Sequence, residues 1–264
     1  KKFQINGNLK NEKNKINNDI ILLIFKDNLE IFDFSNTKFE STSEFNFDLS
    51  KKFRIKNLKI DTKLNLDELI LKYDSNKIKN YIKNYNNLIN LKQNKLHIEY
   101  SKEKVLIDGS SKFYIDENFD NSINFQIKKI KNKIDFKTLL NLDKIKFSIE
   151  DIAYKKLRNQ NATLQVKGFK NNKKLLFEGI DYKEKNNSIV INNLEINNNK
   201  ITNVGKIKFD FLSKNNFKNQ INLIKKDDNY ELVGKSFDSI QLIENISNSE
   251  SDKNFFEIFE NLNS

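Results

Sequence analysis

The sequence predicts a mainly β protein built from antiparallel strands. Segment after segment alternates apolar and polar residues, and successive side chains of a strand point to opposite faces. The clearest case is 206–211, where Ile207, Phe209 and Phe211 share one side. Short runs of Asn, Asp, Ser and Lys separate the segments, which favours tight connections between antiparallel neighbours. Each strand therefore has one apolar face that something must cover.

Residues 1–77 are expected to form an N-terminal stretch of this sheet. Their alternation and turn residues predict strands near 3–10, 20–26, 28–34, 36–49, 52–61 and 63–73. The longest apolar run, 20–25, is bounded by Asp19 and Lys26. A membrane-spanning helix needs roughly 20 apolar residues, so this run predicts a strand buried on both faces.

An amphipathic helix is expected over 78–91. Its apolar residues recur at a spacing of three and four, with Lys and Asn on the other side: Ile78, Tyr81, Ile82, Tyr85, Leu88 and Ile89. This change of period is the domain boundary that the sequence supports.

A second stretch of sheet is expected over 95–235. The pattern predicts strands near 95–100, 104–108, 111–116, 122–128, 131–137, 143–149, 160–168, 173–183, 187–197, 199–212, 216–226 and 229–235. Apolar spacing from Phe237 predicts a short helix capped by Ser236 or Asp238, so 236–264 is expected to be a capping helix and tail. The apolar register slips between Ile55 and Leu58 and between Ile191 and Leu194, which predicts two bulges.

The apolar face of the sheet needs a cover that the helices cannot supply. Two or three short helices are too few for some seventeen strands, so the sheet either closes on itself as a sandwich or barrel, or curls into a groove. At 264 residues the chain can form one large all-β domain or two ordinary ones.

The formal net charge of +11 does not indicate a nucleic-acid-binding protein. Lys is interleaved with Asp and Glu along the whole chain, and nucleic-acid binding needs a basic stripe beside aromatics. The pattern instead predicts a solvated outer face, and the alternative is a mild attraction to anionic lipid headgroups.

The sequence offers nothing from which a zinc site or a nucleophile–His pair could be built. There is no Cys, and the one histidine, His97, falls on the outer side of its strand. Six isolated glycines offer no phosphate-binding loop, and the acid pairs 150–151 and 227–228 lie where turns favour them. We expect no enzyme activity, no cofactor and no metal.

Four segments in the second half carry a resemblance to a known family. In order they are Ile152-Ala153-Tyr154-Lys155-Lys156, residues 162–168, residues 189–196, and residues 230–243, which close on a strand–Gly–x–x–Phe–Asp–x–x–x–Leu–Ile piece. This order resembles the AsmA-like superfamily of Gram-negative envelope proteins, in particular its large YhdP/TamB-type members from proteobacteria. The resemblance covers roughly 95–247.

The resemblance implies a long, twisted antiparallel sheet curled into a taco-shaped hydrophobic groove. It also implies a periplasmic protein, anchored in the inner membrane, that conducts phospholipid toward the outer membrane. Its implied partners are phospholipid, the inner membrane and outer-membrane components. The chain begins inside a strand pattern without an initiator Met, so we expect a segment of a longer protein whose anchor lies elsewhere. The family has no catalytic motif.

The side chains expected to line the groove lie on the apolar side of the later strands. They are Ile123, Phe125, Ile127, Ile145, Phe147, Ile149, Leu164, Val166, Ile189, Ile191, Ile207, Phe209, Phe211, Ile221, Leu223 and Leu232.

Two other functions remain open at this stage. A structural or adhesive surface protein would bury the same side chains in a closed sandwich core. A partner-holding domain would fill the groove with peptide.

Overall fold

The computed structural model describes residues 3–15, 31–115, 121–198, 200–227, 229–240 and 243. Within these residues the chain is mainly β, as predicted, with one antiparallel sheet of fourteen strands and a separate two-stranded sheet. The predicted strand at 20–26 and most of the predicted C-terminal helix lie outside the described residues. At the start of that helix, the Asp238 carboxylate accepts a hydrogen bond from the Ile240 N–H at 3.4 Å.

The chain divides into two compact units. Unit 1 comprises Lys1–Ser75 and Tyr85–Phe136, and unit 2 comprises Asn76–Asn84 and Lys137–Ser264. Along the chain the assignment changes on both sides of residues 76–84, a segment that contains the helix, and again within strand β8 (Lys133–Asn141).

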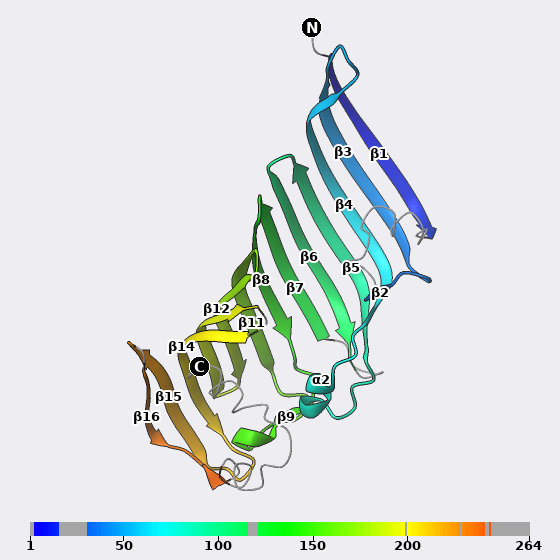
Figure 1. Cartoon of the computed structure of the whole chain (residues 1–264). Coiled ribbons are helices and arrows are strands. Elements are labelled where there is room, and N and C mark those ends of the chain that lie inside the picture. Colours follow the sequence, from blue (N-terminus) through cyan, green and yellow to red (C-terminus); the bar gives the residue numbers. More distant parts are fainter. Residues whose placement is uncertain are drawn as a thin grey trace. The chain divides into compact units, whose positions relative to one another are not determined.

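Unit 1 is an antiparallel meander in the order β1-β3-β4-β5-β6-β7, with the short β2 paired to β4 (Figure 1). Its strands are β1 (Phe3–Lys15), β2 (Phe32–Asp33), β3 (Lys38–Leu49), β4 (Ile55–Lys72), β5 (Leu88–Ser101), β6 (Lys104–Tyr114) and β7 (Asn121–Ile130). The breaks expected within β4 and β6 do not occur. Polar residues such as Asp61 and Asp108, which resemble a turn in the sequence, are outer-face positions paired on both sides.

Unit 2 continues with strands in the order β11-β12-β13-β14-β15-β16, all antiparallel. They are β11 (Ala162–Asn171), β12 (Lys174–Glu184), β13 (Asn187–Asn197), β14 (Lys200–Leu212), β15 (Lys218–Lys226) and β16 (Asn229–Ser236). The two-stranded sheet consists of β9 (Phe147–Ile149) and β10 (Tyr154–Lys156), joined by the 3-10 turn η2 (Glu150–Ile152), and helix α2 (Asn76–Tyr81) packs against β9.

Helix α2 is much shorter than the helix predicted over 78–91. It closes with a 2.8 Å hydrogen bond from the Ile82 N–H to the Ile78 carbonyl, and β5 begins at Leu88. Between them Asn87 takes a φ of 67°, and Tyr85 is buried with its hydroxyl donating to the Tyr73 carbonyl at 2.6 Å. Asn favours such turns, so the helical spacing of the later apolar residues was coincidental.

Of the two predicted bulges, the one between Ile55 and Leu58 is confirmed, because the register of β3 against β4 shifts there, between Asn46 and Asp48. Between Ile191 and Leu194 the register of β13 does not shift against β12 or β14. Asn57 and Asn193 each adopt a φ of 54°, the left-handed region that Asn tolerates better than most residues. A bulge adds one residue, so the apolar side chains beyond it return to the original face. Other register shifts, among them a bulge at Gln93, were not predicted.

Candidate binding surface on the apolar face

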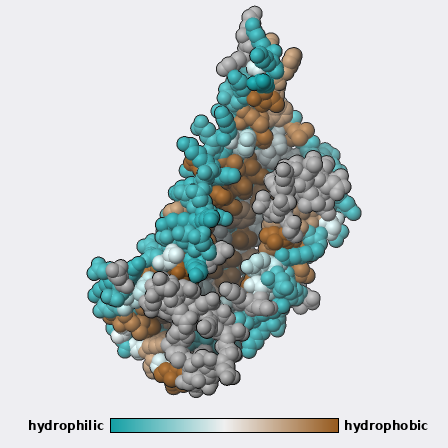
Figure 2. Space-filling view, viewed as in Figure 1, coloured by the Kyte–Doolittle hydropathy of each residue, from teal (hydrophilic) through white to brown (hydrophobic). Residues whose placement is uncertain are grey.

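The apolar face of unit 1 carries continuous rows of side chains across its strands. Residues directly opposite one another on antiparallel strands share a face. Three rows follow from the register: Gly7-Phe45-Ile60-Tyr100-Val105, then Thr62-Ile98-Ile107-Ile127, then Leu64-Leu96-Gly109-Phe125. None of these residues is buried, and Figure 2 shows apolar side chains gathered in a hollow over the strands of this unit, flanked by hydrophilic ones.

Towards the end of β4 the same face becomes a closed core. Leu66, Leu69, Phe113 and Tyr85 are all buried there. Asn94, also buried, donates from Nδ2 to the carbonyls of Leu66 and Leu91, each at 3.2 Å. The accessible part of the face therefore lies over residues 60–64 of β4 and their neighbours.

Two glycines let aromatic rings lie flat on this face. Phe45 lies opposite Gly7 and Phe125 opposite Gly109. A Cβ on Gly7 would come within 2.3 Å of the Phe45 Cζ, and one on Gly109 within 2.2 Å of the Phe125 Cζ. Because glycine has no side chain, each ring rests on the backbone of the next strand and keeps the floor of the hollow low.

The predicted lining residues of unit 2 also share one face of the sheet. The register gives two rows, Leu164-Tyr182-Ile189-Phe209-Ile221 and Val166-Ile180-Ile191-Ile207-Leu223-Leu232. Leu232, on the last strand, is 63 % exposed, whereas Phe211 is completely buried. In unit 2 this face is therefore largely a core.

A segment that we call the strap, residues 142–161, covers part of the unit 2 face. It contains β9, η2 and β10. The ring of Tyr154 lies 5.3 Å from that of Phe211, and the ring of Phe147 lies 5.5 Å from that of Tyr182.

The strap corrects one part of the predicted lining. Ile145, Phe147 and Ile149 do not belong to a strand of the large sheet, because β9 pairs with β10 alone after the tight turn at Ala153. Alternation in the sequence identifies a strand but not the sheet that it joins.

A buried polar network holds the strap in place. The Tyr154 hydroxyl donates to Glu184 Oε2 at 2.5 Å and lies 2.8 Å from the Tyr182 hydroxyl, which must then be the donor between the two. Burial raises the pKa of both tyrosines, and for Tyr154 the hydrogen bond to Glu184 adds to the effect. Asn187 also donates to Glu184 Oε2, at 3.0 Å.

The strap also contains a fully buried lysine. Lys156 Nζ donates to the carbonyls of Asp143, Ile145 and Leu157 at 3.1, 2.8 and 3.0 Å. Burial lowers the pKa of this amine. All three ammonium protons are satisfied within the strap, which leaves no donor for a ligand.

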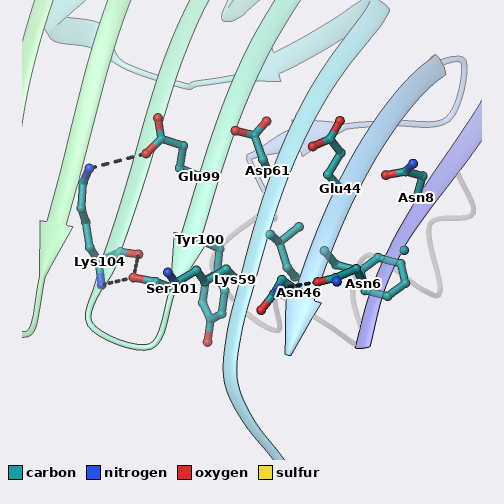
Figure 3. A pocket seen from close by; sticks show the side chains of 13 residues that line it. Asn6, Asn8, Glu44, Asn46, Lys59, Asp61, Glu99, Tyr100, Ser101 and Lys104 are labelled. Atoms are coloured by element: carbon teal, nitrogen blue, oxygen red, sulfur yellow. Dashed lines mark hydrogen bonds and ion pairs between the residues drawn. The ribbon is translucent and has the colours of Figure 1, made fainter. Parts of the chain in front are cut away.

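The outer face of unit 1 is polar and chemically different. On this face the side chains of Asn8, Glu44, Asp61 and Glu99 stand side by side on four strands (Figure 3). They line a hollow of about 610 Å³, whose lining also includes Gly7, Phe45, Ile60 and Tyr100 from the apolar row. His97 lies on this face as predicted, with Nε2 3.0 Å from Asp61 Oδ1. Within the described residues, no three His, Cys, Asp or Glu side chains converge on a metal position.

The sequence-based list of lining residues missed most of unit 1. It included Ile123, Phe125 and Ile127 on β7, which the structure places on the accessible face. It omitted Phe45, Ile60, Ile98 and Ile107, although residues 38–49 show the same alternation. The missing signal was strand pairing, which places Phe45 beside Ile60 in one row and Ile98 beside Ile107 in the next.

No family model, curated protein or solved structure matches the chain. Its own fold and faces define it as a mainly β protein with one large antiparallel sheet, whose apolar face is accessible in unit 1 and partly covered by the strap in unit 2. No helix in the described part of the chain combines the length and the apolar character needed to span a bilayer.

Proposed function

We propose that the chain binds lipid acyl chains on the apolar face of unit 1. The observation that carries the proposal is the accessibility of its apolar rows. The described strands form one large sheet plus the β9–β10 pair of unit 2, so no described strand packs over this face. A closed sandwich would have covered it.

The geometry of the rows suits an extended apolar ligand. Neighbouring strands lie about 4.8 Å apart, so the five-strand row from Gly7 to Val105 is about 19 Å long. Each methylene that moves from water onto such a surface contributes about 0.8 kcal/mol. A row of Ile, Leu and Phe side chains without deep pockets contacts the acyl chain along its length and allows the acyl chain to slide.

The resemblance to AsmA-like proteins extends this proposal to transport. On that basis the chain is a periplasmic segment that conducts phospholipid between inner and outer membranes, with its membrane anchor elsewhere. The headgroups would remain at the polar rim while the acyl chains occupy the rows.

The alternative, a structural all-β protein with a closed core, is supported by unit 2. Phe209, Phe211 and Leu223 are buried there, partly beneath the strap. Substituting them would unfold a core under either proposal, so they cannot distinguish the two.

Two adjacent residues on β6 provide the test. Ile107 faces the apolar rows, whereas Leu106 lies on the outer face opposite Glu99 and Lys128. Native mass spectrometry and lipid extraction of the purified chain should find phospholipid that Ile107→Asn loses and Leu106→Asn retains. A lipid-free wild-type chain, or equal lipid in both variants, would refute acyl binding on this face.

A further inference from the structure

The hairpin tip between β3 and β4 displays an aromatic ring to solvent. Residues 50–54 read Ser-Lys-Lys-Phe-Arg, and Phe53 is 83 % exposed. Two more apolar side chains lie at the same end of the strands, since Phe3 pairs with Leu49 and Leu49 with Ile55. Phe3 is 59 % and Ile55 58 % exposed. We call residues 50–55 with Phe3 the tip.

The backbone of the tip is fixed. The Ser50 N–H donates to the Arg54 carbonyl at 3.0 Å, and the Phe53 N–H donates to the Ser50 carbonyl at 2.9 Å. The Arg54 N–H donates to Ser50 Oγ at 3.1 Å. Phe53 sits in this turn with a φ of 54°, a left-handed conformation that is unfavourable for a bulky residue.

The same turn occurs in unit 2 with a different residue at that position. Residues 213–217 repeat the pattern, with Ser213 N–H to the Phe217 carbonyl at 2.9 Å and Asn216 N–H to the Ser213 carbonyl at 2.9 Å. There the left-handed position is occupied by Asn216, with a φ of 60°. Of the thirteen described non-glycine residues with positive φ, seven are Asn and Phe53 is the one aromatic. The turn therefore does not need Phe53, and strain of this kind points to a function outside the fold.

Basic side chains surround the exposed ring. Lys51, Lys52, Arg54 and Lys56 are exposed, and none forms an ion pair with a described residue. The nearest carboxylate along β3, Asp48, accepts a 2.6 Å hydrogen bond from Asn57 Nδ2. An exposed aromatic ring surrounded by cations matches the surface of an anionic bilayer, where apolar and phosphate groups lie within a few ångströms of each other.

We propose that the tip docks the chain on an anionic membrane surface, with Phe53 inserted at headgroup level and the basic side chains on lipid phosphates. This docking does not depend on acyl binding along the rows. Phe3, Leu49 and Ile55 form a row on the same face of the sheet as Phe45 and Ile60. A docked tip therefore brings one end of the apolar face to the bilayer.

The test measures co-sedimentation of the full chain with vesicles of phosphatidylcholine, with or without phosphatidylglycerol. We expect binding to the anionic vesicles that weakens as salt is raised. Phe53→Asn introduces the residue type found at the equivalent position, Asn216, of the sister turn at residues 213–217. This variant should weaken binding roughly tenfold. A double Lys51→Gln, Lys52→Gln variant should weaken it by a similar factor.

Phe217→Ser provides the matched control, because Phe217 is an exposed phenylalanine in the sister turn. This variant should bind as the wild type does. Equal binding by wild type and Phe53→Asn would overturn the proposal, as would equal binding to neutral vesicles. A concentration-dependent dimer that Phe53→Asn abolishes, without vesicle binding, would also overturn it and assign the tip to contact with a second copy. Phe53→Asn should keep any co-purified phospholipid, so the two proposals fail separately.

Discussion

The ring of Phe125 lies against the backbone of Gly109 on the neighbouring strand, in the space that a side chain would fill. A Cβ built on Gly109 comes within 2.2 Å of the Phe125 Cζ and 2.6 Å of its Cε1. The ring therefore forms part of the floor of the accessible apolar face, and it does so because position 109 has no side chain.

Gly109→Ala should destabilise the chain. Alanine is favoured over glycine in a strand by about 0.5–1 kcal/mol, but displacing the ring costs about 1–3 kcal/mol. The net effect is therefore a lower free energy of unfolding. Chemical denaturation measures the change. Gly179→Ala is the control, since its nearest contact is the flexible Lys167 Cε at 3.1 Å. Equal stability of the two variants would show that the ring moves aside freely.

Removing the Tyr154 hydroxyl should loosen the strap. Tyr154→Phe leaves the buried Glu184 without its shortest donor, which we expect to cost about 1–3 kcal/mol in the free energy of unfolding. Tyr182→Phe removes a hydrogen bond between two hydroxyls and should cost less, about 1 kcal/mol. Urea unfolding of both variants tests the order, and a larger loss for Tyr182→Phe would contradict the donor assignment.

The same network should make unit 2 sensitive to alkaline pH. Burial raises the pKa of Tyr154 and Tyr182 above the ordinary value of 10.0, so above pH 10 the unfolded state binds fewer protons than the folded state. This stabilisation is fully present below about pH 10 and is lost as the pH rises towards the folded-state pKa values. Burial lowers the pKa of Lys156, so the contribution of this residue to the free energy of unfolding rises with pH, opposite to that of the tyrosines.

Comparison of the wild type with a double Tyr154→Phe, Tyr182→Phe variant isolates the tyrosines, because Lys156 is present in both. Between about pH 9 and about pH 11 the wild type should lose more unfolding free energy than the variant. Parallel losses would mean that the two hydroxyls titrate normally.

Phe53→Asn should stabilise the fold while it weakens membrane docking. Replacing a bulky residue at a φ of 54° relieves about 1 kcal/mol of backbone strain. The reciprocal Asn216→Phe, in the sister turn, should lower stability by a similar amount. Thermal unfolding measures both, and a destabilised Phe53→Asn would show that the ring packs on the fold.

Sequence patterning predicts the fold class well because strand alternation is a local property. The slip after Ile55 even locates a bulge, where Asn57 takes a left-handed conformation in an otherwise regular period. The prediction of a helix over 78–91 was wrong beyond its first turns, because Leu88 and Ile89 have helical spacing by coincidence and begin strand β5. Asn87 takes a turn conformation that the apolar period does not reveal.

The candidate surface depends on pairing, which is not local. The side chains of Ile189, Phe209 and Ile221 were grouped correctly because consecutive hairpins align them. The strap could not be anticipated, since Phe147 alternates like any strand residue and yet packs on the sheet from above. The resemblance to AsmA-like proteins, on which the transport proposal relies, stays a prediction.

The most direct test of acyl binding is photo-crosslinking. The chain is incubated with phospholipid that carries a photoreactive group on an acyl chain, irradiated, digested and mapped by mass spectrometry. The proposal predicts adducts on the apolar rows of unit 1, at Ile98, Ile107 and Ile127, and none at Leu106 on the other face of the same strand. Adducts confined to the outer face, or a chain that acquires none, would contradict it.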